Sequence, residues 1–98
     1  MSLRLGYRAE AFADIAEAFS WYQERRPGLG WEFEAALHDT LTFLRQAPEA
    51  GPVVHRSLRR ALLPRFPYAI YYSLAADVLE VRGVLHTRGS PKRWRSRA

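Results

Sequence analysis

Hydrophobic residues alternate with other residues over the first eight positions of the chain. Leu3, Leu5 and Tyr7 are separated by Arg4 and Gly6. A period of two is typical of a strand that buries one face. We therefore expect a short strand over residues 3–8.

The period changes to that of a helix in two successive segments, residues 9–26 and residues 30–46. Pro27-Gly28 ends the first segment and Pro48 follows the second. The apolar positions are Phe12, Ile15, Ala16, Phe19 and Tyr22 in the first segment and Phe33, Ala36, Leu37, Thr40, Leu41 and Leu44 in the second. Because few residues join the two segments, we expect an antiparallel helical hairpin.

Three further strands are expected in the second half, near residues 54–63, 68–74 and 78–86. The last two are rich in β-branched and aromatic residues and flank Ala75-Ala76-Asp77, which predicts a β-hairpin. The order β-α-α-β-β-β indicates an α+β fold. We expect the N-terminal helical hairpin to pack on one face of a small, mostly antiparallel four-stranded sheet. Residues 1–98 are interpreted as one domain with a basic C-terminal tail, residues 87–98.

The net charge of +5 hides an asymmetry between the two halves. Residues 1–49 hold five basic and eight acidic side chains, which is 5 − 8 = −3, and residues 50–98 hold ten and two, which is 10 − 2 = +8. We therefore expect a positive face that meets a negatively charged partner. The chain has no cysteine, which excludes disulfides and thiolate metal sites. We see no secretory signal and no apolar run of the length of a membrane span, so we expect a cytoplasmic protein.

The candidate site is the sheet face that the helices do not cover. In the last strand, simple alternation places Arg82 and His86 on this face. Alternation in the expected strand over residues 54–63 brings either Arg59 or Arg60 to this face, and Arg65 lies at the turn into the next strand. The simpler interpretation is a solvated face, which antiparallel sheets commonly have. We expect Trp94 to pack the tail against the body of the domain.

Several short motifs, taken in order, resemble the RelE/ParE toxin superfamily. They are Asp14 and Trp21-Tyr22 in the first helix, Arg26-Pro27-Gly28-Leu29-Gly30, Pro48-Glu49, Arg65-Phe66-Pro67-Tyr68, Val84-Leu85-His86-Thr87-Arg88, Ser90-Pro91 and Trp94. The resemblance covers essentially the whole chain. It implies the toxin of a type II toxin–antitoxin system, often described as a plasmid stabilisation protein. It also implies an antitoxin partner and is compatible with a heterotetramer of the two.

The resemblance leaves two activities open. A RelE-like toxin cuts mRNA on the ribosome without a metal, and here the catalytic residues would be His86, Arg65 and Arg82. Such cleavage needs a base, an acid and cations at the phosphate, and arginine serves only the last role. A ParE-like toxin poisons DNA gyrase and lacks that catalytic set.

The Leu-His-Thr-Arg ending favours the ParE-like branch, so the leading expectation is a gyrase inhibitor that arrests growth. Gly89 and Ser90 depart from the usual family pattern, in which an arginine and an aspartate are common there. Contacts with the antitoxin or the target are assigned to Arg60, Arg82, His86, Arg88 and Trp94. No cofactor is expected, because neither metal-ligand spacing nor a phosphate-binding loop is present. A plain nucleic-acid-binding module is the third alternative.

Overall fold

The computed structural model describes residues 2–98. Its elements are β1 (Arg4–Tyr7), α1 (Ala9–Arg25), α2 (Leu29–Gln46), β2 (Val53–His55), β3 (Leu58–Leu62), β4 (Tyr68–Ala75), β5 (Val78–His86) and α3 (Pro91–Arg95). Within these residues the strands form one five-stranded sheet in the order β1-β5-β4-β3-β2. β1 is parallel to β5 and the other neighbours are antiparallel. The α+β fold is confirmed.

The strand count differs from the expected four. The segment expected as one strand, residues 54–63, forms both β2 and β3, which a tight turn separates. Arg56 in this turn has φ 54°, a left-handed conformation that reverses the chain. β2 is therefore a short edge strand that pairs with β3 only near Leu58 and Arg59.

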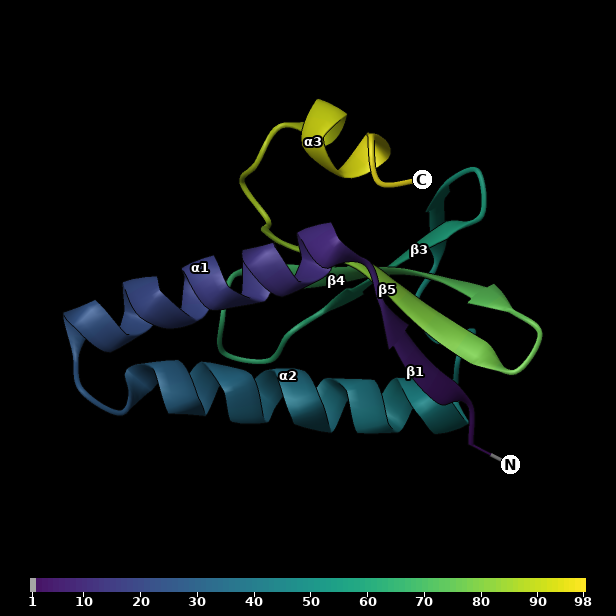
Figure 1. Ribbon diagram of the computed structural model, residues 1–98. Coiled ribbons are helices and arrows are strands. Elements are labelled where there is room, and N and C mark those ends of the chain that lie inside the picture. Colours follow the sequence, from purple (N-terminus) through teal and green to yellow (C-terminus); the bar gives the residue numbers. More distant parts are fainter. Residues whose placement is uncertain (1) are drawn as a thin grey trace.

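The helical hairpin covers one side of the sheet, as expected (Figure 1). The α2 stripe is buried much as predicted. The buried side of α1 is instead formed by Ala11, Asp14, Ala18 and Tyr22, whereas Phe12 is largely exposed. The small side chains of Ala11 and Ala18 allow α1 to lie close to β5. The side of α1 that faces the sheet is therefore not the one that the apolar spacing predicted.

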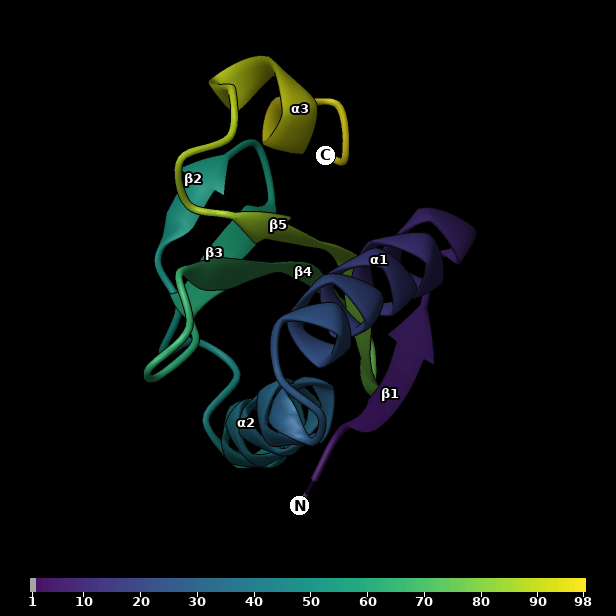
Figure 2. The same cartoon turned by 90° about the vertical axis from the view of Figure 1, so that its left-hand side faces the viewer.

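The tail, residues 87–98, contains a short helix that lies on the opposite side of the sheet from α2 (Figure 2). Ser90 caps this helix, its hydroxyl accepting a hydrogen bond from the Lys92 amide at 3.2 Å, and Pro91 starts it. The Trp94 ring stacks on Tyr71 with centroids 5.6 Å apart. The expectation that Trp94 packs the tail against the body is confirmed.

A β-bulge in β5 changes which residues share a face. Tyr71 pairs with Gly83 but Tyr72 pairs with Val81, so Arg82 is an extra residue in β5. Val81 and Val84 consequently both belong to the core under the helical hairpin, although they are three residues apart. Alternation along β5 shifts by one residue at this point.

Candidate functional site

The face of the sheet that α3 covers is called here the α3 face. Its buried residues are Leu58, Ala69, Tyr71 and Leu85, against which Val54, Trp94 and Ala98 pack. Arg60 pairs with Tyr71 in the sheet and therefore projects to this face, whereas Arg59 pairs with Tyr72 and projects to the helical side. Arg60 is thus the arginine that alternation brings to the expected face.

Arg82 also belongs to the α3 face, but it is not a free cation. Its Nε lies 2.9 Å from a carboxylate oxygen of Glu80, two residues earlier in β5. Its side chain is mostly buried, and Nη1 donates to the main-chain oxygen of Arg97 at 3.4 Å. These contacts give Arg82 a role in holding the tail.

A buried ion pair fixes the end of the tail to α1. The Arg97 guanidinium donates to both oxygens of Asp14, at 2.6 and 3.1 Å, and to the main-chain oxygen of Arg82 at 2.9 Å. The Val84 amide donates to the same carboxylate at 3.0 Å. A hydrogen bond to Asp14 is the largest cause of the raised pKa of Arg97.

Gly83 makes room for this arrangement. A Cβ atom at Gly83 would lie 2.8 Å from Nη1 of Arg97 and 3.3 Å from Oδ2 of Asp14. The sequence interpretation did not identify the Asp14–Arg97 pair. The sequence does hold one sign of it: Asp14 lies at helical spacing with Ala11, Ala18 and Tyr22, so an acidic side chain falls on the buried side of α1.

His86 does not share a face with Arg82, and this expectation was wrong. Because the bulge at Arg82 shifts the alternation, His86 lies on the helical side, as Val84 does. Its ring meets that of Tyr68 edge to face, with centroids 5.2 Å apart. Its Nδ1 accepts a hydrogen bond from the Arg88 amide at 3.1 Å, which leaves Nε2 as the nitrogen available to another group.

Two adjoining hollows lie beside His86. The larger, about 440 Å³, is lined by Glu17, Trp21, Tyr22, Pro67, Tyr68 and His86. The smaller, about 110 Å³, shares Glu17, Tyr68 and His86 with it and extends to Asp14 and Arg93. Burial and the charge of Glu17 raise the pKa of Tyr68, while Arg93 acts in the opposite direction. This cleft brings together titratable side chains that the sequence interpretation had not grouped.

Arg65 lies apart from both arrangements, at the turn that leads into β4. Its backbone has φ 67°, and its guanidinium lies 4.0 Å from Glu32 of α2 and over the ring of Phe66. Arg65 lines neither hollow beside His86. The structure therefore places His86, Arg65 and Arg82 in three different settings.

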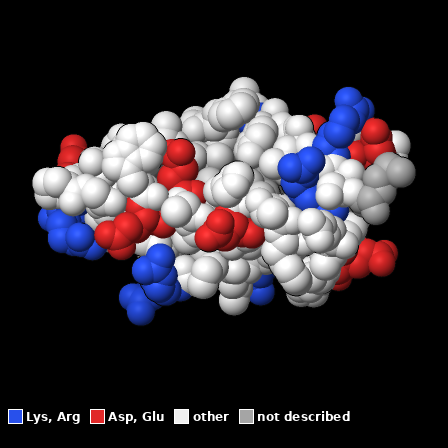
Figure 3. Space-filling model, turned by 90° about the horizontal axis from the view of Figure 1, so that it is seen from below, with Lys and Arg blue, Asp and Glu red and all other residues white. Residues whose placement is uncertain are grey.

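Other cations of the second half remain free. In residues 2–98 the side chains of Arg60 and Arg88 have no ion pair or hydrogen bond. By contrast, the side of the molecule that α2 occupies is mostly uncharged, with scattered acidic and basic side chains (Figure 3). Within the same residues, no three acidic or histidine side chains come together as metal ligands do. The helices described are each too short or too polar to cross a membrane.

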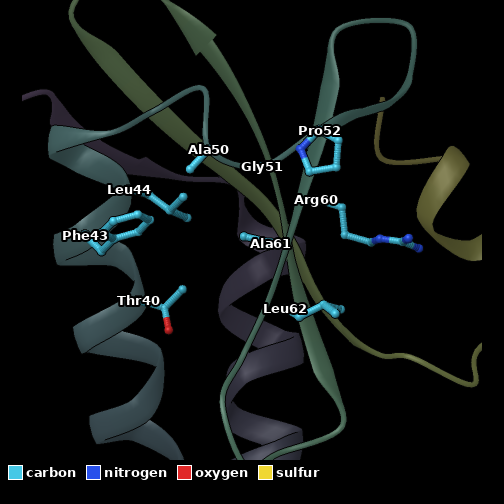
Figure 4. A pocket seen from close by; sticks show the side chains of 9 residues that line it. All are labelled: Thr40, Phe43, Leu44, Ala50, Gly51, Pro52, Arg60, Ala61 and Leu62. Atoms are coloured by element: carbon cyan, nitrogen blue, oxygen red, sulfur yellow. The ribbon is translucent and has the colours of Figure 1, made fainter.

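An apolar groove lies between α2 and β3, next to Arg60. Its volume is about 350 Å³, and its lining is Thr40, Phe43, Leu44, Ala50, Gly51, Pro52, Arg60, Ala61 and Leu62 (Figure 4). Leu62 and Phe43 are 64% and 58% exposed. The last hydrogen bond from β3 to the segment of β2 is the one that the Arg60 amide donates to the Pro52 oxygen. The end of β3, residues 61–62, is therefore an open sheet edge.

The chain has the fold of two solved toxin structures. It superposes on a structure described as the chromosomal ParDE TA system from P. aeruginosa with a TM-score of 0.76, 16% identity, and coverage of 87% of this chain and 96% of that chain. It superposes on free E. coli toxin RelE carrying two arginine-to-alanine changes with a TM-score of 0.71, 18% identity, and coverage of 100% and 95%. No protein-family model and no curated protein matches the sequence. The fold that the sequence resemblance implied is therefore confirmed.

Proposed function

We propose that this chain is the toxin of a type II toxin–antitoxin system. The main support is a shared fold that extends over most of this chain and nearly the whole of the matched chains in the ParDE and RelE structures. The free arginines and the open apolar groove at the edge of β3 also suit a toxin that an antitoxin must cover. In this proposal the protein acts in the cytoplasm and needs no cofactor.

The antitoxin is proposed to bind at the groove between α2 and β3. An apolar segment would bury Phe43 and Leu62. Acidic side chains of the antitoxin would pair with Arg60, which projects to the α3 face, and with Arg88, which lies beyond the end of β5. The open edge of β3 offers unpaired main-chain groups to an extended segment. Arg82 is a weaker candidate for this contact than the sequence suggested, because Glu80 already neutralises it.

Expression from an inducible promoter tests this assignment. We expect growth arrest by the chain alone and normal growth when an adjacent gene for a small acidic protein is co-expressed. A variant with Arg60→Glu and Arg88→Glu should escape the antitoxin or lose toxicity. A control with Arg4→Glu and Arg26→Glu changes the net charge equally at exposed positions, where it also removes ion pairs with Asp77 and Glu32, and it should keep the growth phenotype of the parent. Harmless expression of the folded parent in several bacterial hosts would refute the proposal.

The target is proposed to be DNA gyrase. The separation of His86, Arg65 and Arg82 supports this choice, because metal-free RNA cleavage needs its acid, its base and its cations around one phosphate. Purified protein should inhibit gyrase supercoiling, induced cells should form filaments, and ribosome-bound mRNA should stay intact. Cleavage of mRNA at the ribosomal A site with gyrase unaffected would contradict the choice.

One observation favours the RelE-like activity as a second candidate. His86, Tyr68 and Glu17 line the same hollow, so titratable side chains lie together there. His86→Gln keeps a hydrogen-bonding side chain but removes proton transfer. If His86 is a general acid or base, this substitution should lower the rate of mRNA cleavage about 10²–10⁴-fold, and toxicity should fall with it. In a gyrase inhibitor most of the toxicity should remain, because binding free energy is shared among several side chains.

A further inference from the structure

The larger hollow beside His86 has the dimensions of a binding site. At about 440 Å³ it lies within the range typical of ligand pockets, and it is formed by the second half of α1, Pro67, the start of β4 and the end of β5. Residues from three separate parts of the chain build it, so its shape depends on the folded domain. Neither the antitoxin groove nor the α3 face includes it.

The charge of this hollow is opposite to that of the protein. The chain has a net charge of +5, yet the residues that line the hollow include Glu17 and no lysine or arginine. Within residues 2–98 the Glu17 carboxylate has no ion pair or hydrogen bond, so its charge is not neutralised internally. Burial, and after it the charge of Glu17, raise the pKa of Tyr68 in the wall of the hollow, whereas Arg93 of the adjoining hollow acts in the opposite direction.

The walls of the hollow are mainly aromatic. Trp21 and Tyr22 meet edge to face at 5.1 Å, and Tyr22 and Tyr68 do so at 6.0 Å, so that three rings surround one space. Ring faces attract cations. Trp21 already shows this behaviour, because the Arg25 guanidinium lies 4.0 Å from its ring centroid.

We propose that this hollow is a socket for an arginine side chain of a protein partner. A planar guanidinium can stack on an aromatic ring while it donates two N–H groups to the Glu17 carboxylate. An ammonium group cannot stack in this way, and a phosphate would meet an uncompensated carboxylate. The inference goes beyond the proposed function, because it holds for a partner of any identity and does not depend on toxicity.

The probe for this socket is N-acetyl-arginine amide, titrated into the purified chain and followed by NMR signals of the Trp21 indole and Tyr68. We expect a dissociation constant on the order of 1–10 mM, which is typical of a single small anchor. N-acetyl-citrulline amide has nearly the same shape without the charge and should bind at least about tenfold more weakly.

Matched variants locate the site. Glu17→Gln and Trp21→Ala should each weaken binding of the arginine amide by about tenfold or more. Glu24→Gln, another exposed acid of α1, and Trp31→Ala, an exposed tryptophan of α2, should leave the dissociation constant unchanged. Glu17 has no partner within the described residues, so its substitution should keep the native spectrum.

Three results would overturn the proposal. Citrulline amide could bind as tightly as arginine amide, Glu17→Gln could leave binding unchanged, or guanosine monophosphate could shift the Trp21 and Tyr68 signals where arginine amide does not. The last result would assign the hollow to a nucleobase. All of these measurements are made on the isolated chain, so they succeed or fail independently of any growth arrest.

Discussion

Tyr71 and Tyr72 are consecutive residues of β4, both fully buried, and they face opposite sides of the sheet. Tyr72 lies under the helical hairpin, where its hydroxyl donates to the Pro48 oxygen at 2.8 Å and accepts from the Gly51 amide at 3.1 Å. Tyr71 lies on the α3 face, where its ring stacks on Trp94. The two sides of one strand are therefore closed by different means.

On the helical side, the buried area is shared among many apolar side chains of α1, α2 and the sheet, so each single contact contributes a small part of the stability. The α3 face is closed by a helix of five residues, which includes the stacked Trp94, and by one buried ion pair. We conclude that the attachment of the tail depends on a few side chains that lie far apart in the sequence. Single substitutions test this contrast directly.

Asp14→Asn should have the largest effect on stability. The change leaves the guanidinium of Arg97 mostly buried without a counter-charge, and breaking a buried pair by removing one partner is strongly destabilising. We expect a loss of about 3 kcal/mol in the free energy of unfolding. Urea denaturation followed by tryptophan fluorescence measures it, and a loss below about 1 kcal/mol would mean that the pair does not hold the tail.

Trp94→Ala should rank second, with a loss of about 2 kcal/mol from the apolar area and stacking removed at Tyr71. Trp31→Ala provides the comparison, because Trp31 is highly exposed and touches Phe19 only edge to face. Its loss should be less than half as large. Equal losses for the two tryptophans would show that α3 contributes little to the stability of the domain.

Tyr72→Phe should cost about 1–2 kcal/mol, because the main-chain groups of Pro48 and Gly51 lose their partner. Tyr71→Phe should be nearly neutral, because Tyr71 is held by stacking. The pair of variants is measured in the same denaturation assay. A larger loss for Tyr71→Phe would reverse the assignment of the two sides.

The same tyrosine gives a pH prediction. Burial raises the pKa of Tyr72 above its ordinary value of 10.0, although the Gly51 hydrogen bond and Arg59 act against this. A group whose pKa is raised by folding gives stability that is present below pH 10 and lost as the pH rises through the folded-state pKa. The stability of Tyr72→Phe should therefore fall less steeply above pH 10 than that of the parent.

The sequence predicted those parts of the fold that local periodicity determines. A repeat of 3.6 residues predicts the two helices, and a repeat of two predicts the strands of the β4–β5 hairpin. The apolar positions of both also predict that the helices cover one side of the sheet. The tight turn at Arg56 was missed because a non-glycine residue in a left-handed conformation gives no strong signal. The prediction consequently merged β2 and β3 into one strand.

The candidate site was less predictable, and the reason is one residue. Alternation placed Arg82 and His86 together, but the bulge at Arg82 moves His86 to the other side of the sheet. The Asp14–Arg97 pair joins residues 83 positions apart and gives no local pattern at its tail end. The choice of Arg60 over Arg59 was resolved only by the register with Tyr71.

The smallest effect is expected at a second ion pair, between Arg4 and Asp77. Its two hydrogen bonds, at 3.1 and 3.2 Å, join the same kinds of groups as those of Asp14 and Arg97, at 2.6 and 3.1 Å, but both side chains are more than two thirds exposed. Water already stabilises exposed charges and salt screens them, so Asp77→Asn should leave stability at neutral pH almost unchanged.

Acid titration can still detect this pair. The hydrogen bond from Arg4, followed by its charge, holds the pKa of Asp77 below the ordinary value of 3.8. A lowered pKa gives stability that is present above pH 3.8 and lost as the pH falls through the folded-state value. Asp77→Asn should remove that small acid-dependent loss at low salt, and high salt should remove it in the parent too. If Asp77→Asn destabilised the domain as much as Asp14→Asn, burial would not be what distinguishes the two pairs.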